Sequence, residues 1–387
     1  MLAICSDLDE TPDRFIYFEI MKYLNTPRLT VMGDGVGLEV GNTIYFDMPA
    51  NQFAYWNTDD AGRYMVRSLI QSGHIDCFHS YGDLATTRHH AERALAELTR
   101  YDCRLEVWID HGVAPSNFGG DIMRGSGDVP GSPVYHADLA CDFGVRYVWR
   151  GRVTSVIGQD VPRSMSGIGN WHHPLASGKT VAKELSKGWL ARMGYAKYAM
   201  NAMNKVMCST QLRSGQPVWE FLRANPHWGG VSSSETADGL ADVLTESMLS
   251  RLVKQEGACV LYTHLGKISN YDEPFGPKTR EALKRLARYV SGKNILVTTT
   301  RRLLGYHEAV RAVQVSSARH GEQTIMNVTI EGREADLNGL TLYVPEPERV
   351  QLRVNGREID GLYRNAPDET GRASVSVPWR PLVFPEL

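Results

Sequence analysis

Short apolar runs recur along the first three hundred residues, and most are followed by a polar residue and then a stretch with helical spacing. These runs lie at residues 2–7, 75–79, 105–111, 145–149, 218–222, 258–264 and 294–298. Amphipathic helices are predicted between them, most clearly over residues 278–290, 236–253 and 87–98. Buried strands that alternate with amphipathic helices are typical of βα units around a parallel sheet. The pattern predicts an α/β fold, and seven such strands would suit a barrel.

Two stretches interrupt this pattern, and a third region replaces it. Residues 25–60 are rich in Gly, Thr and aromatic residues, which favours a β-hairpin excursion between the first strand and its helix. Residues 158–217 form a long insertion of the kind that covers a substrate site. From about residue 308, short alternating runs with Asn-Gly turns predict a small antiparallel β domain. We therefore expect a deformed barrel over residues 1–306 and a β-sandwich-like domain over residues 307–387.

Composition narrows the class of protein. The chain has 387 residues, with 42 Lys and Arg against 44 Asp and Glu, for a net charge of −2. This balance argues against a general nucleic-acid binder, and no apolar run approaches the roughly 18 residues of a membrane span. The six cysteines form no Cys-x-x-Cys pair and mostly have apolar neighbours. With no secretory signal visible, we expect reduced thiols and a cytoplasmic protein.

Acidic and histidine side chains follow four of the predicted strands. In a parallel barrel, the carboxyl ends of the strands meet at one edge, where functional side chains gather. Each residue alone is also typical of a helix N-cap or a turn. Their repetition at four strand ends indicates one common site, formed by Asp7, Asp9, His79, Asp83, Asp110, His111 and His264.

Asp and His side chains from different strands can hold a divalent cation and leave one coordination position open for water or substrate. A carboxylate beside that position could accept the proton of the water. A histidine on the opposite wall could protonate a leaving group. The residue types therefore suit metal-assisted hydrolysis.

The segment Gly73-His74-Ile-Asp-Cys-Phe-His79-Ser80-Tyr81 resembles the second motif of the polysaccharide deacetylases, the NodB-type family. Asp7-Leu8-Asp9 resembles the paired aspartates of that family, and residues 258–264 resemble its late strand ending in the catalytic histidine. The resemblance follows residues 1–306 in order. It implies a deformed barrel of about seven βα units, of the glycoside hydrolase and deacetylase type. It also implies Asp7 as the base and His264 as the acid.

The metal site implied by the resemblance differs from the family pattern at two points. The first is that Leu8 separates the two aspartates, which are adjacent in the family. The other is that, where the family has a second metal histidine four residues after the first, this chain has Asp83, an oxygen donor. The expected ligands are therefore Asp9, His79 and Asp83, with zinc as the first expected metal and manganese or nickel as the others. The arginine-proline-rich third motif of the family is missing, and residues 108–112 stand in its place.

Candidate substrate-binding residues lie beside these strand ends. Trp171 and His172 fall in the predicted insertion, where an indole ring could stack on a sugar or could equally be the buried core of a structured loop. His111 follows the third strand, and Arg150 lies near the expected place of the fourth family motif.

Three functions remain open at this point. The first is a metal-dependent carbohydrate hydrolase that removes acetyl groups from a glycan or its precursor. The second is a glycoside hydrolase, for which Asp110 and the other strand-end carboxylates would supply the catalytic pair, about 5–5.5 Å apart in a retaining enzyme and about 6.5–9.5 Å apart in an inverting one. The third is a glycan-binding protein with a degenerate site.

Overall fold

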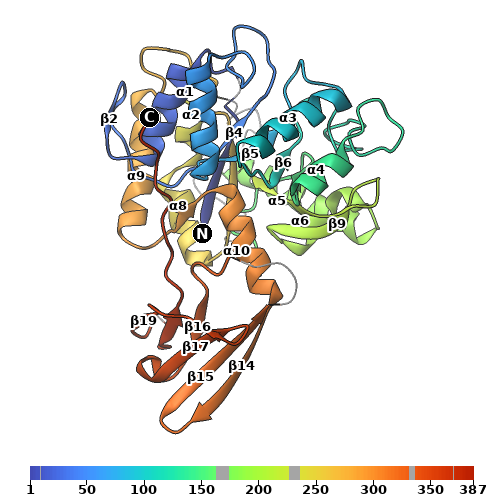
Figure 1. Ribbon diagram of the computed structural model, residues 1–387. Coiled ribbons are helices and arrows are strands. Elements are labelled where there is room, and N and C mark those ends of the chain that lie inside the picture. The colour runs from blue at the N-terminus through green and yellow to red at the C-terminus, as the bar shows by residue number, and fades with distance from the viewer. Residues whose placement is uncertain (9, 163–173, 226–235, 331–335, 369) are drawn as a thin grey trace. The chain divides into compact units, whose positions relative to one another are not determined.

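A computed structural model describes residues 1–8, 10–162, 174–225, 236–330, 336–368 and 370–387 (Figure 1). The chain divides into two compact units. The first comprises Met1–Arg301 together with Leu382–Leu387, and the second comprises Arg302–Pro381.

The first unit is an α/β structure built on a curled, mostly parallel sheet that forms a half-barrel (Figure 1). Neighbouring strands follow the order β8-β11-β12-β1-β4-β5-β6-β7-β10-β9, and β13 pairs with the start of β1. Within this sheet, β9 and β10 pair antiparallel. The strands are β1 (Leu2–Ser6), β4 (Asn42–Ile44), β5 (Ile75–His79), β6 (Val107–Ile109), β7 (Tyr147–Trp149), β8 (Val153–Thr154), β9 (Met207–Gln211), β10 (Pro217–Phe221), β11 (Arg223–Ala224), β12 (Cys259–Thr263) and β13 (Val297–Thr298).

Helices connect these strands, and several begin at the side-chain caps that the sequence favours. Asp13, Asp59, Thr87 and Thr245 each accept a hydrogen bond from the backbone N–H three residues later. The helices are α1 (Arg14–Asn25), α2 (Asp60–Gln71), α3 (Arg88–Arg100), α4 (Ala137–Phe143), α5 (Pro174–Arg192), α6 (Ala199–Met203), α7 (Leu240–Val243), α8 (Glu246–Gln255), α9 (Pro277–Ser291) and α10 (Thr300–Ala312), which crosses into the second unit; a 3-10 turn spans Ala196–Tyr198.

The helix predicted over residues 236–253 is two helices instead of one. The backbone leaves helical geometry at Leu244, and Thr245 then caps α8 as a new helix. Both α7 and α8 still bury their apolar residues, so the periodicity gave the correct inner face. The helix α9 likewise buries Ala282, Leu283 and Leu286.

The expected β-hairpin excursion over residues 25–60 is wrong in part. The helix α1 follows β1 directly, and the hairpin is confined to β2 (Leu29–Thr30) and β3 (Gly33–Asp34). The chain then returns to the sheet as β4, which lies between β1 and β5 and pairs parallel with both. This strand has three residues, Asn42-Thr43-Ile44, of which two are polar, so no apolar run marked it.

The insertion expected over residues 158–217 contains α5, α6 and β9 in its described part. Residues 163–173 of this insertion lie outside the described residues. The structure describes no helix that is long and apolar enough to cross a membrane.

The second unit contains two small sheets around a core that includes Val328, Leu352 and Val375. One sheet follows the order β14-β15-β17-β18, and the other follows β16-β20-β19. The pairing of β15 with β17 is parallel, whereas the sequence predicted antiparallel strands throughout. The elements are β14 (Val313–His320), β15 (Gln323–Ile330), β16 (Thr341–Tyr343), η4 (Pro347–Arg349), β17 (Val350–Val354), β18 (Arg357–Glu358), β19 (Tyr363–Asn365) and β20 (Ser374–Ser376).

Candidate functional site

Three predicted site residues meet at the carboxyl edge of the parallel sheet. Asp7 follows β1, His79 ends β5 and His264 follows β12. The Oδ2 atom of Asp7 lies 3.7 Å from Nε2 of His79 and 3.8 Å from Nε2 of His264. All three side chains are buried. One carboxylate oxygen is therefore placed between two imidazoles that come from different strands.

A sharp turn after β5 fixes the position of His79. Ser80 and Gly82 both adopt positive φ angles, 49° and 105°. A side chain at Gly82 would place its Cβ 2.1 Å from the carbonyl oxygen of Asp47, so only glycine fits there. The turn lets the chain leave the sheet immediately after the imidazole.

Arg223 forms a bidentate ion pair with Asp7. Its Nη1 donates to Oδ2 at 2.8 Å and its Nη2 donates to Oδ1 at 2.7 Å, and Nη2 lies 3.1 Å from the sulfur of Cys5. The guanidinium also lies over the rings of Trp149, at 4.3 Å, and Tyr262, at 4.8 Å. A bidentate pair packed against two aromatic rings is a strong and geometrically specific way to orient a buried carboxylate.

The charge of Arg223 controls the ionisation of Asp7. Burial by itself would raise the pKa of the Asp7 carboxyl. The guanidinium, and to a smaller extent His79 and His264, overcome this effect and lower the pKa below its usual value. Asp7 is therefore a carboxylate at neutral pH.

The two imidazoles are themselves positioned by tyrosines. The hydroxyl of Tyr45 lies 2.7 Å from Nδ1 of His79, and the two rings stack with centroids 4.9 Å apart. The hydroxyl of Tyr262 lies 3.3 Å from Nε2 of His264. Each imidazole is thus held by a neutral hydroxyl as well as by the field of Asp7.

Sequence reasoning missed Arg223 and both tyrosines. A charged residue directly after the apolar run 218–222 could have pointed to Arg223, as Asp7 was found after its own run. Tyr45 directly follows β4, the strand that the sequence did not reveal.

Asp83 and His111 form the more exposed rim of this cluster. Oδ1 of Asp83 lies 3.2 Å from Nδ1 of His111, and the carboxylate is half-exposed. The His111 ring lies 4.6 Å from that of His79 and 5.2 Å from that of Tyr45, measured between centroids. Asp83 and His111 therefore lie between solvent and the buried imidazole of His79.

Asp110, predicted to be catalytic, is bound by donors from its own strand and the loop that follows. Its oxygens accept hydrogen bonds at 2.8 Å from Nε1 of Trp108 and from the backbone N–H groups of Phe118 and Gly119. Burial raises the pKa of Asp110 to about 7, although these hydrogen bonds favour the charged form. The side chain is fully buried and anchors the loop that follows β6.

Arg150, expected to bind substrate, is held by a carboxylate of the fold. Glu220 accepts hydrogen bonds from its Nε at 3.1 Å and its Nη2 at 2.7 Å, and also lies 3.2 Å from Nε of Arg152. Both arginines are mostly buried in this ion-pair network. The predicted substrate residues Trp171 and His172 lie outside the described residues.

The expected metal ligands are not brought together by the part of the chain that the structure describes. Nδ1 of His79 contacts Tyr45, its Nε2 faces Asp7, and Asp83 pairs with His111. Asp9 lies outside the described residues. Within the described ranges, no three His, Cys, Asp or Glu side chains are grouped so that they could hold a metal ion. Because Asp9 lies outside these ranges, the site of Asp9, His79 and Asp83 stays a prediction.

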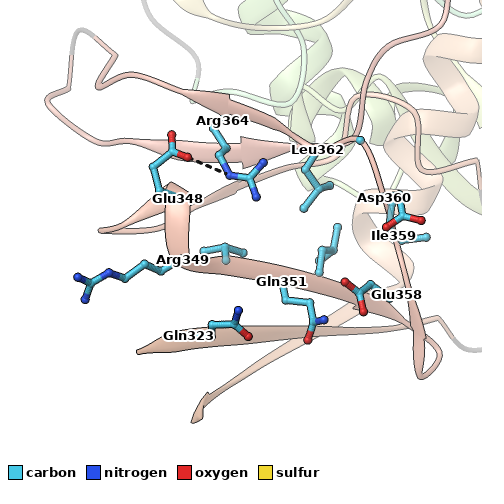
Figure 2. A pocket seen from close by; sticks show the side chains of 12 residues that line it. Gln323, Glu348, Arg349, Gln351, Glu358, Ile359, Asp360, Leu362 and Arg364 are labelled. Atoms are coloured by element: carbon cyan, nitrogen blue, oxygen red, sulfur yellow. Dashed lines mark ion pairs between the residues drawn. The ribbon is translucent and has the colours of Figure 1, made fainter. Parts of the chain in front are cut away.

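A separate pocket of about 220 Å³ lies in the second unit (Figure 2). Carboxylates, amides and guanidinium groups line it, and Glu348 pairs with Arg364 at 3.4 Å. Its lining includes no aromatic ring on which a sugar could stack. The pocket shares no residue with the cluster around Asp7.

No protein-family model, curated protein or solved structure matches this chain. The class that the structure itself defines is an α/β protein with a curled parallel sheet and a cluster of ionisable side chains at its carboxyl edge.

Proposed function

We propose that this chain is a carbohydrate hydrolase that removes acetyl groups from a glycan or a glycan precursor, on a deformed (β/α)7 barrel. The observation that carries the proposal is the placement of one carboxylate oxygen of Asp7 at 3.7 and 3.8 Å from the imidazoles of His79 and His264. The carbohydrate substrate is supported by the resemblance of the residues around Asp7, His79 and His264 to the deacetylase motifs.

In the proposed reaction, the two imidazoles move the protons. Because Arg223 keeps the pKa of Asp7 low, Asp7 acts by orienting the imidazoles and stabilising their charged forms. The water gives a proton to the Tyr45 hydroxyl as the water oxygen attacks the acetyl carbon, and that hydroxyl passes its own proton to Nδ1 of His79. The carbon–nitrogen or carbon–oxygen bond then breaks, and His264 donates a proton to the departing amine or alcohol, which leaves acetate.

Glycosidic cleavage is less well supported by the same residues. A glycosidase needs two carboxyl groups that reach the substrate. Asp7 is bound by Arg223, and Asp110 is fully buried among three donors. Asp83 is the half-exposed carboxylate of the described cluster. For this reason we place acetyl hydrolysis first.

The test compares the release of acetate and of new reducing ends from acetylated glycans, such as N-acetylglucosamine oligomers. We expect acetate without new reducing ends, and a loss of at least about 100-fold in His264→Gln, the size of a general acid–base contribution. The matched control is His89→Gln, an exposed histidine on α3, which keeps full activity.

Two outcomes contradict the proposal. New reducing ends would assign the site to glycosidic cleavage. Glycan binding without either product, unchanged in His264→Gln, would indicate a binding protein.

The divalent metal implied by the resemblance stays a prediction. Elemental analysis of the wild type, Asp9→Ala and His79→Ala tests it independently of activity. Near-stoichiometric zinc in the wild type, lost in both variants, confirms the metal site. A wild type without metal after supplementation with zinc, manganese or nickel contradicts the metal site. The proposed reaction would then depend on proton transfer by the imidazoles alone.

A cytoplasmic role in glycan synthesis or turnover is part of the same proposal. All six cysteines are free of disulfides. Buried, unbridged thiols are typical of proteins kept in a reducing compartment.

A further inference from the structure

The helix α5 has an inverted distribution of polar and apolar side chains. Its inner face carries Thr180 and Glu184, and Glu184 is completely buried. Lys187 turns inward as well, donating to Glu184 at 2.9 Å and to the carbonyl oxygen of Val153 at 3.1 Å. An ordinary surface helix would place apolar residues at these positions.

The outer face of α5 carries large apolar side chains instead. Leu185 and Trp189 are each 61% exposed, and Met193, just beyond the helix, is 55% exposed. Residues four apart lie on one face of a helix, so these side chains form a continuous stripe. We call Leu185, Trp189 and Met193 the α5 stripe.

Cations flank this stripe. Residues 174–205 contain six Lys or Arg and a single acid, Glu184, so the segment carries 6 − 1 = +5 in a chain whose net charge is −2. By helical spacing, Lys179 and Lys183 lie along one side of the stripe and Arg192 along the other, and all three are exposed.

Comparison with α9 shows which feature is distinctive. That helix is also basic, with five Lys or Arg against one Glu over Pro277–Ser291. However, α9 buries its apolar residues and presents its cations to solvent. Positive charge therefore occurs on both helices, and the outward apolar stripe belongs to α5.

We propose that the α5 stripe attaches the protein to an anionic lipid surface. Leu and Trp would enter the boundary between headgroups and acyl chains, and the flanking cations would contact lipid phosphates. A second copy of the chain is a poorer partner, because a twofold contact through the same face would bring two sets of cations together. The stripe also lacks the acids that would neutralise such a contact.

Sedimentation with lipid vesicles tests this attachment on the full-length protein. We expect binding to vesicles of phosphatidylcholine with one quarter phosphatidylglycerol, and little binding to phosphatidylcholine alone. Salt should weaken the binding, because it screens the attraction of cations to the surface.

Two pairs of variants separate the apolar and the charged contributions. Leu185→Ser with Trp189→Ser, and Lys179→Glu with Lys183→Glu, should each lower vesicle affinity by about tenfold or more. The matched controls are Val113→Ser, at a side chain 92% exposed, and Lys284→Glu on α9, both of which should bind as the wild type does. Thermal unfolding of every variant verifies that it folds.

Three results would overturn the proposal. One is an absence of binding to either kind of vesicle. Another is a loss of vesicle affinity in the Lys284→Glu control equal to that of Lys179→Glu with Lys183→Glu, which would mean that only the overall charge of the protein matters. The third is a concentration-dependent dimer that disappears in the Leu185→Ser, Trp189→Ser variant, which would make the stripe an interface between copies of this chain.

Discussion

Asp7 and Asp110 follow two strands of the same sheet, and both are buried, yet their surroundings give them opposite properties. Asp7 is bound by a guanidinium, which lowers its pKa. Asp110 is bound by an indole N–H and two backbone N–H groups, and burial raises its pKa to about 7. The difference lies in the charge of the partner, since neutral donors do not offset the cost of burying a negative charge.

The partners also differ in where they come from. Those of Asp110 lie within nine residues of it, at Trp108, Phe118 and Gly119. Those of Asp7 come from distant parts of the chain, at His79, Arg223 and His264. A carboxylate that binds donors close to it in sequence stabilises its own loop. A carboxylate that contacts side chains from several strands brings distant residues together at one point. Asp110 is therefore bound within its own strand and loop, whereas Asp7 is bound by residues from several strands.

The largest expected effect comes from removing the cation beside Asp7. Arg223→Leu leaves a buried carboxylate without its charged partner, which we expect to lower the free energy of unfolding by about 3–5 kcal/mol. Urea denaturation measures this change. The double variant Asp7→Asn, Arg223→Leu removes both charges and should recover most of the loss.

The matched control is Arg288→Leu, which breaks the exposed pair with Glu281. Exposed ion pairs contribute little to stability, so its unfolding curve should nearly coincide with that of the wild type. An Arg223→Leu variant that is as stable as this control would show that Asp7 is not the buried anion described above.

The opposite pKa directions predict opposite pH dependences. Asp110 binds its proton more tightly in the folded chain, so its contribution to stability is complete below about pH 4 and declines as the pH rises toward 7. The decline should be about 1 kcal/mol per pH unit across this window. The contribution of Asp7 is present above about pH 4 and is lost as the pH falls below its lowered pKa.

Denaturation of the wild type and Asp110→Asn at several pH values tests this expectation. The variant cannot ionise at position 110, so the stability of the wild type relative to it should fall between pH 4 and pH 7. A constant difference over that range would mean that the pKa of Asp110 is not raised.

The apolar runs predicted the α/β class and most strands of the first unit, because each run is long enough to be buried on both faces of a sheet. They missed β4, whose Asn42 and Thr43 are buried polar residues in a three-residue strand. The strand ends predicted that Asp7, His79 and His264 would meet. The charged residue after the run 218–222 could have marked Arg223 as a candidate, but its pairing with Asp7 could not be predicted, because that pairing depends on how β11, β12 and β1 lie beside one another in the curled sheet.

The smallest expected effect concerns Tyr45, the neutral partner inside the charged site. A carboxylate can only accept a hydrogen bond, so the nearby Asp7 favours a proton on Nε2 of His79. Nδ1 then accepts from the Tyr45 hydroxyl at 2.7 Å, which fixes the tautomer and the orientation of the ring. Tyr45→Phe removes this hydrogen bond while keeping the stacked ring, so stability should fall by only about 1 kcal/mol.

Activity and its pH profile separate positioning from simple packing at Tyr45. If the hydroxyl sets the state of His79, the Tyr45→Phe variant should lose about tenfold in acetate release, with a shifted pH profile and little change in KM. Tyr64→Phe, at an exposed ring on α2, is the matched control and should leave both unchanged. An unshifted profile with full activity would mean that the Tyr45 hydroxyl contributes to the fold, as Asp110 does, and not to the reaction. The orientation of the His79 imidazole would then depend on Asp7 alone.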